Sequence, residues 1–166
     1  MFRHNEPVPG EFGNSPAQRT QRDGVLRKYR RLLLNHDLMM VLEETPQPVA
    51  VLDCNRQVIY ANRPLLGLFR DCDLTEVMHY RPGELIGCRQ ADALPSGCGT
   101  TAHCTNCRFA RSVARAEKSR RTVSFQAPFG DAEAPWLSSQ VGVLVRPVRL
   151  NGEQHYFLTL HNAWGR

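Results

Sequence analysis

The sequence predicts an α+β fold in which a helix is followed by two strands, a helical middle segment and three further strands. Three observations support this order: good helix formers over 23–44, two short apolar runs within 49–61, and apolar alternation after residue 122. Apolar residues that recur every three or four positions indicate a helix, whereas strict alternation indicates a half-buried strand. The 166 residues suffice for one ordinary domain with an extension.

The first part of the chain changes character near residue 20. Residues 1–20 are rich in Pro, Gly, Asn and Gln and nearly lack aliphatic side chains, so we expect a disordered tail. Residues 21–45 are expected to form one helix that ends at Thr45, because a residue before proline is pushed out of the α region. Apolar positions on more than one face predict that this helix packs on two sides, against its own domain or against a partner copy.

The remaining elements follow from apolar runs and turn residues. We expect short helices and loops over 71–100 and a helix over 105–118. Asn151-Gly152 lies between two alternating runs, which is a strong signal for a β-hairpin. The predicted strands are 49–52, 58–61, 122–127, 141–145 and 156–160.

Composition restricts the classes of function. The chain is 42% apolar and 22% charged, near the averages of globular proteins. It contains no run of about 18 apolar residues, so we expect no membrane span. The N-terminus lacks the apolar core of a secretory signal, so we expect a cytoplasmic protein in which a disulfide framework is disfavoured. The net charge of +5 permits contact with nucleic acid but does not argue for it, and we interpret the basic run at 27–31 as a solvated helix face.

Four of the six cysteines lie within twenty residues, at Cys88, Cys98, Cys104 and Cys107. Buried cysteines can simply fill a core, but this segment is rich in Gly, Thr and Ser rather than in Val and Leu. Four soft thiolates are the ligand set of tetrahedral zinc or of an iron–sulfur cluster. We therefore predict a metal or cluster site made by these four residues.

The predicted helix over 105–118 bears on the charge of this site. Cys104 and Cys107 would lie at its N-terminus, where unpaired N–H groups and the helix dipole stabilise anionic sulfur. Further compensation of the negative charge of a cluster is expected from arginines near the cysteines, namely Arg89, Arg108 and Arg111.

Histidines offer a few alternatives. His103, beside a predicted ligand, could replace one cysteine, although such a histidine is more often exposed. His36 and His79 are minor candidates for haem ligands. Cys54 and Cys72 have no partner at metal-ligand spacing.

Three segments resemble the PAS domain superfamily. PVAVLD (48–53) and VIYAN (58–62) resemble the opening strands of PAS domains, and GELIG (83–87) resembles a step in their helical middle. The resemblance covers about residues 38–162 and implies a PAS domain over 46–162, preceded by a signalling helix. It also implies a five-stranded antiparallel sheet, a pocket between sheet and helices, and dimerisation through the flanking helix.

The cysteine segment also looks similar to a cysteine-rich subgroup of PAS domains in bacterial sensor proteins, and to PAS sensors that hold an oxygen-labile iron–sulfur cluster. Those have two Cys-x2-Cys pairs, whereas this chain has one, so zinc stays open beside a [4Fe-4S] cluster. The sequence NCRF (106–109) matches the flavin-binding motif of related light sensors but lies about twenty residues late. Flavin is therefore disfavoured.

The function expected from the sequence is that of a sensory module rather than an enzyme, since no catalytic constellation is evident. A cluster on the four cysteines would report oxygen or redox state to a separate kinase or transcription regulator, from a homodimer formed through the N-terminal helix. Two alternatives stay open. Zinc could stabilise an interaction module, or Cys104 and Cys107 could form a reversible disulfide without a metal.

Overall fold

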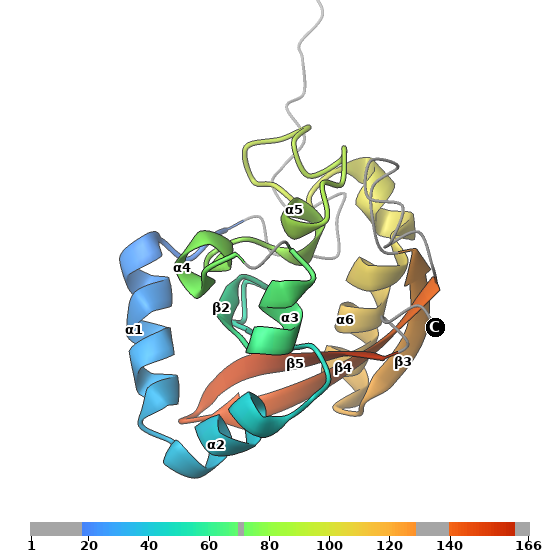
Figure 1. Ribbon diagram of the computed structural model, residues 1–166. Coiled ribbons are helices and arrows are strands. Elements are labelled where there is room, and N and C mark those ends of the chain that lie inside the picture. Colours follow the sequence, from blue (N-terminus) through green and yellow to red (C-terminus); the bar gives the residue numbers. More distant parts are fainter. Residues whose placement is uncertain (1–17, 70–71, 129–139, 162–166) are drawn as a thin grey trace, which may run out of the picture.

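The computed structural model describes residues 18–69, 72–128 and 140–161, and within these ranges it contains one five-stranded antiparallel sheet flanked by helices (Figure 1). The strand order is β2-β1-β5-β4-β3. This confirms the predicted α+β fold with a helical segment between the second and third strands. The strands are β1 (Val49–Leu52), β2 (Val58–Ala61), β3 (Val123–Pro128), β4 (Gln140–Leu150) and β5 (Glu153–His161).

The helices lie before β1 and between β2 and β3. None of those in the described ranges is long and apolar enough to cross a membrane. The helices are α1 (Arg22–Leu33), α2 (His36–Glu44), α3 (Arg63–Gly67), α4 (Leu74–Val77), α5 (Pro82–Leu85), the 3-10 helix η1 (Ala102–Asn106) and α6 (Arg108–Ser119).

The prediction of one helix over 21–45 was wrong, because the chain breaks into α1 and α2 at Leu34 and Asn35. The side chain of Asn35 accepts a hydrogen bond from the N–H of Leu38 at 3.2 Å and so caps α2. An asparagine in this position satisfies an N–H group of a new first turn. Apolar periodicity hid the break, since it runs through both helices. The predicted end is confirmed, with Thr45 as the C-cap of α2.

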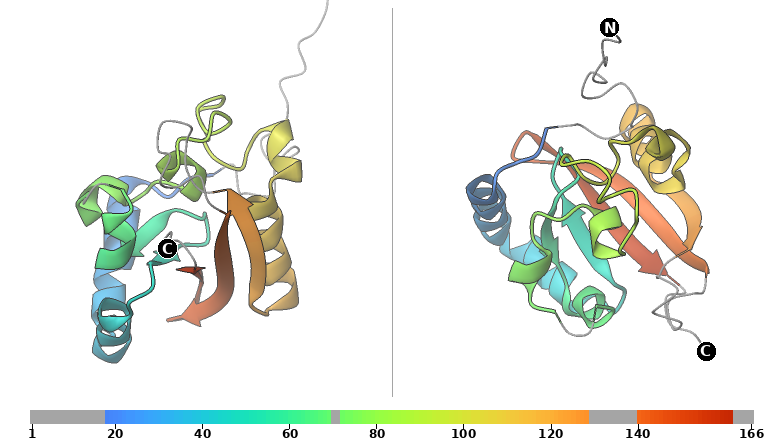
Figure 2. Two further views of the ribbon diagram at one scale, coloured as in Figure 1. Left: turned by 45° about the vertical axis from the view of Figure 1, so that its right-hand side comes forward. Right: turned by 90° about the horizontal axis from the view of Figure 1, so that it is seen from above.

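Both faces of β1 are buried. Ala50 and Leu52 point into a core shared with α3, α4 and α6, whereas Val49 and Val51 point into a second core shared with α1 and α2. Figure 2 shows α1 and α2 on one side of the strands and α6 on the other. A strand covered on both faces needs no polar alternation. This is why β1 and β2 are short continuous apolar runs in the sequence.

The predicted hairpin at Asn151 and Gly152 is confirmed. These residues join β4 to β5 with φ angles of 51° and 80°. Two successive positive φ angles are typical of the type I′ turn that suits paired strands. Together β4 and β5 form the longest ladder of the sheet.

The segment just before α1 differs from the predicted tail. Residues 1–17 lie outside the described ranges, but Thr20 is held by the domain: its N–H donates to Gln57 Oε1 and its hydroxyl to Asp53 Oδ2, both at 2.6 Å. Lys28 on α1 donates to the same Asp53 oxygen at 2.8 Å. The N-terminal segment is thus fastened to the turn that follows β1.

Asn62 joins the end of α2 to the sheet. Its buried side-chain oxygen accepts from the N–H groups of Val49 at 2.9 Å and Leu65 at 3.2 Å. Its amide nitrogen faces three main-chain carbonyls, those of Leu42, Thr45 and Gln47.

We expect Asn62→Asp to lower the free energy of unfolding by about 3 kcal/mol, because a buried carboxylate would replace the donor that these carbonyls need. Chemical denaturation measures the loss. Asn151→Asp makes the same change in an exposed turn, where Asp tolerates the backbone conformation, and should cost no more than about 0.5 kcal/mol. Equal losses in the two variants would contradict the role of Asn62.

Candidate functional site

The four predicted ligand cysteines line one cavity of about 150 Å³. It lies between the inner face of the sheet and the segments around α3, α5 and α6. Its walls are otherwise mainly apolar, so the sulfur atoms are its main chemical feature. Besides the cysteines, the lining includes Ala50, Val58, Leu65, Phe69, Leu85, Ile86, Phe109, Ala127, Val143, Leu158 and Leu160.

Cys88 and Cys98 meet around one glycine of α5. The N–H of Cys88 donates to the carbonyl of Gly83 at 2.8 Å. The sulfur of Cys98 packs on Gly83 so closely that a Cβ there would lie only 2.5 Å from it. Glycine is therefore required at this point by the close approach of the sulfur.

Cys98 is half-buried, with its sulfur against Gly83. Burial raises its pKa to about 12, and the nearby Cys107 and Cys104 add to the rise, while an N–H of Gly83 that faces the sulfur acts in the opposite sense. A group with such a pKa is protonated at neutral pH. Metal binding would therefore release the proton of Cys98.

Cys104 and Cys107 lie where α6 begins. Cys104 is buried in η1, with its sulfur 3.2 Å from the hydroxyl of Thr101. Cys107 is exposed and is the N-cap residue of α6. The helix begins at Arg108, slightly later than predicted, and only Cys107 stands directly at its N-terminus.

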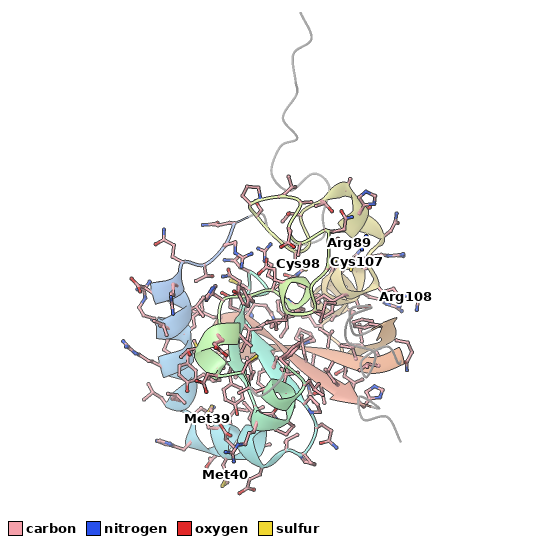
Figure 3. All side chains as sticks on the ribbon, turned by 45° about the horizontal axis from the view of Figure 1, so that its top comes forward. Met39, Met40, Arg89, Cys98, Cys107 and Arg108 are labelled. Carbon is pink, nitrogen blue, oxygen red and sulfur yellow. The ribbon has the colours of Figure 1, made fainter. Side chains whose placement is uncertain are left out.

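The remaining sequence candidates do not all reach the cavity. His103 contributes to the lining, whereas His36 and His79 do not. Arg89 and Arg108 lie at the same end of the molecule as Cys98 and Cys107 (Figure 3), but neither lines the cavity. Cys54 and Cys72 are also outside it, as expected.

The four thiols are suitable ligands for a soft metal, and the size of the cavity limits which metal group or cofactor it could hold. Across the described residues, no three or more His, Cys, Asp or Glu side chains stand at the spacing that would hold a metal ion. The four cysteines line the cavity without meeting at one point. A cavity of about 150 Å³ is also smaller than the roughly 300–1,000 Å³ of pockets for larger organic ligands, which argues against flavin or haem.

Two charged residues of this site were missed in the sequence. Arg81 is fully buried, and its guanidinium donates to main-chain carbonyls that include that of Cys98, at 3.0 Å. Glu84 accepts from the N–H of Cys98 at 3.1 Å. Burial alone would raise the pKa of Glu84, but hydrogen bonds from Arg19, Arg81 and Cys98 outweigh it, so the pKa lies below its usual value. The main chain at Cys98 is therefore held by two charged side chains, those of Arg81 and Glu84.

Comparison with known proteins supports the fold. A sequence model of the PAS fold matches residues 42–162. The PAS domain of an HTR-like protein from Haloarcula marismortui is similar over 81% of this chain and 96% of that chain, with 14% identity and a TM-score of 0.50. An RNA-binding light-oxygen-voltage receptor is similar over 78% of this chain but only 33% of its own, with 15% identity and a TM-score of 0.50. No relative was found among the curated proteins.

The contact between Gly83 and Cys98 gives a test of the site. We expect Gly83→Ala to lower the free energy of unfolding by about 1–3 kcal/mol, although alanine favours a helix, because the added methyl group overlaps the sulfur. The double variant Gly83→Ala/Cys98→Ala removes that sulfur. It should be more stable than the sum of the two single changes implies. Simple additivity in denaturation experiments would show that the sulfur does not lie against Gly83.

Proposed function

This chain belongs to the PAS-fold family, and we propose that it senses oxygen or redox state through an iron–sulfur cluster held by Cys88, Cys98, Cys104 and Cys107. As a PAS domain it is a sensory module of signal transduction. The proposed redox role rests above all on one observation: four cysteines, separated in sequence by up to nineteen positions, line a single small cavity.

The arrangement of the thiols favours a cluster over zinc. A single zinc ion needs four ligands that converge at about 2.3 Å, whereas a cluster is bound through separate iron atoms and needs thiols spread around it. The four cysteines line one cavity without standing at the spacing of a single metal ion, which matches the second requirement better. A [4Fe-4S] cluster would supply a redox-active, oxygen-sensitive centre.

The surrounding residues would tune such a site. Cys107 is the N-cap residue of a helix of 12 residues, so the positive end of the helix dipole lies beside it. The N–H of Gly83 faces the sulfur of Cys98. Hydrogen bonds of this kind are among the factors that set the potential of a cluster. Apolar walls limit the access of water to the site.

The signal would pass to a separate kinase or transcription regulator from a cytoplasmic homodimer. Three well-exposed apolar side chains near the α1–α2 joint support association at that end: Leu34, Met40 and Val41 are 77%, 55% and 59% exposed. Figure 3 shows Met39 and Met40 at the opposite end of the molecule from Cys98 and Cys107. A dimer formed there would leave the cysteine end uncovered.

The first experiment is anaerobic purification followed by an absorption spectrum and analysis of iron, acid-labile sulfide and zinc on one sample. We expect a brown protein with iron and sulfide that bleaches in air. Substitution of any of the four cysteines by serine should remove most of the iron, because a cluster held by three thiolates lacks a ligand. Cys54→Ser changes an exposed cysteine outside the cavity and should leave the iron content unchanged.

Other outcomes would reject the cluster. One zinc per chain in a colourless, air-stable protein would make the cysteines structural. A metal-free protein that loses two titratable thiols on oxidation, through Cys104 and Cys107, would indicate a disulfide sensor. A yellow protein with a flavin spectrum would assign Cys107 to the light-sensing chemistry.

The dimer has its own test. The double substitution Met40→Lys/Val41→Glu should weaken self-association by about tenfold or more, because it places charge on the exposed apolar face of α2. Light scattering after size-exclusion chromatography measures the mass across a range of concentrations. Ser119→Glu on α6 adds a charge elsewhere on the surface and should not change the mass. A monomer in all three proteins would contradict the proposed dimer.

A further inference from the structure

The main chain around Cys98 and the segment that enters α1 are bound by the same buried guanidinium. Arg81 is 0% exposed. Its Nη1 donates to the carbonyls of Ser96 and Cys98, each at 3.0 Å. Its Nη2 donates to the carbonyl of Gln18 at 3.1 Å, and its Nε to that of Asn55 at 2.9 Å. One rigid fork thus fixes the cysteine loop relative to the N-terminal segment.

A carboxylate makes the same connection a second time. Glu84 Oε2 accepts from Arg19 Nη2 at 2.9 Å and from the N–H of Arg81 at 2.9 Å. Glu84 Oε1 accepts from the N–H of Cys98 at 3.1 Å and is also paired with Arg19 Nη1. The Glu84 side chain is only 14% exposed, so solvent screens this pair less than a surface ion pair.

The cysteine loop lies directly against the ion pair. Gly97 has a φ angle of 78°, and a Cβ there would overlap the carboxylate of Glu84 and lie 2.5 Å from the guanidinium of Arg19. A shift of this loop would therefore disturb Glu84 and Arg19 at once, because no space separates them.

We propose that Arg81 and Glu84 form a latch that couples the position of the Cys98 loop to the attachment of residues 18–20 and the first turn of α1. The proposal rests on the proposed function in taking Cys98 as a sensing residue. When Cys98 moves toward or away from the cavity, its own N–H and carbonyl move relative to Glu84 and Arg81. The hydrogen bonds that these two residues make to Arg19 and Gln18 then change with it.

The coupling must act in both directions, because a free-energy coupling between two sites is reciprocal. Loosening the N-terminal segment should loosen the Cys98 loop, and displacing the loop should loosen the segment. If the network were purely static, disrupting it would lower the overall stability of the domain without this mutual effect. The remainder of α1 has a separate attachment through Lys28 and Asp53, so the effect should concentrate on the first turn.

The forward test uses the full chain in metal-free, reduced form, so that it does not depend on a cluster. Arg19→Ala should raise the rate at which iodoacetamide alkylates Cys98 by about threefold to tenfold. Peptide mass mapping follows each cysteine, with Cys72, which lies outside the cavity, as the internal reference. Arg22→Ala is the matched control, since it removes the same charge from an exposed position three residues further on.

The reverse test displaces the loop. Cys98→Leu places a larger side chain against Gly83, and hydrogen exchange over residues 18–33 should become at least about threefold faster in the first turn of α1. Cys72→Leu is the control for the added bulk. A thermal melt first establishes that each variant is folded. If Cys98→Leu does not fold, the alkylation experiment on Arg19→Ala still tests the proposal.

The outcomes separate the latch from the sensor. Faster alkylation of Cys98 in Arg19→Ala, with Arg22→Ala unchanged, supports the latch whether or not the purified protein carries a cluster. Unchanged alkylation in Arg19→Ala, or equal acceleration in Arg22→Ala, overturns the latch even if iron is found. Faster exchange over 18–33 in Cys98→Leu supports the coupling, and exchange equal to that of Cys72→Leu overturns it.

Discussion

The burial of the Arg81 guanidinium is the constraint on which the cysteine end of this molecule depends. A cation withdrawn from water is tolerated only when its donors are satisfied. Arg81 meets this requirement with main-chain carbonyls from three separate segments, those of Gln18, Asn55 and the pair Ser96 and Cys98. The loop that carries Cys98 has little regular secondary structure of its own, so its conformation follows from this side chain.

The helical middle of the fold is thereby divided into two kinds of structure. Near the sheet, α3, α4 and α6 are held by apolar packing against β-strand side chains. Farther out, around residues 88–104, turns and a 3-10 helix are held by hydrogen bonds and by close approach at glycines. Packed apolar cores resist small displacements, whereas a polar network with few members can rearrange as a unit. The segment around Cys98 is of the second kind and is supported by structure of the first kind, so it can rearrange while the core stays in place.

The sequence predicted the sheet well because turns and alternation are local signals. The Asn151-Gly152 hairpin and the two apolar runs of β1 and β2 are examples. It also predicted that Cys88, Cys98, Cys104 and Cys107 belong together, since their chemistry is unusual in so short a stretch. That all four line one cavity agrees with this grouping, while the metal itself stays a prediction.

Arg81 and Glu84 could not be recognised in the same way. Charged residues are mostly exposed, so a single Arg and a single Glu near Pro82 give no sequence signal of burial. In the structure Pro82 lies in the first turn of α5, and the carboxylate of Glu84 accepts from the N–H of Arg81. Their burial depends on residues 18–19 and 96–98, which only the folded chain brings near. The break at Asn35 was hidden for a related reason, because a cap residue carries less weight than continuing periodicity.

That break has a mechanical consequence for the N-terminal region. An unbroken helix behaves as a stiff rod, so tilting one end moves the other. The joint at Leu34 and Asn35 removes this leverage, since a few residues between helices can absorb a change of angle. Asn62 meanwhile anchors the far end of α2 to the sheet. A displacement that starts at Arg19 would therefore stay within α1, beginning in its first turn, while α2 keeps its position on the sheet.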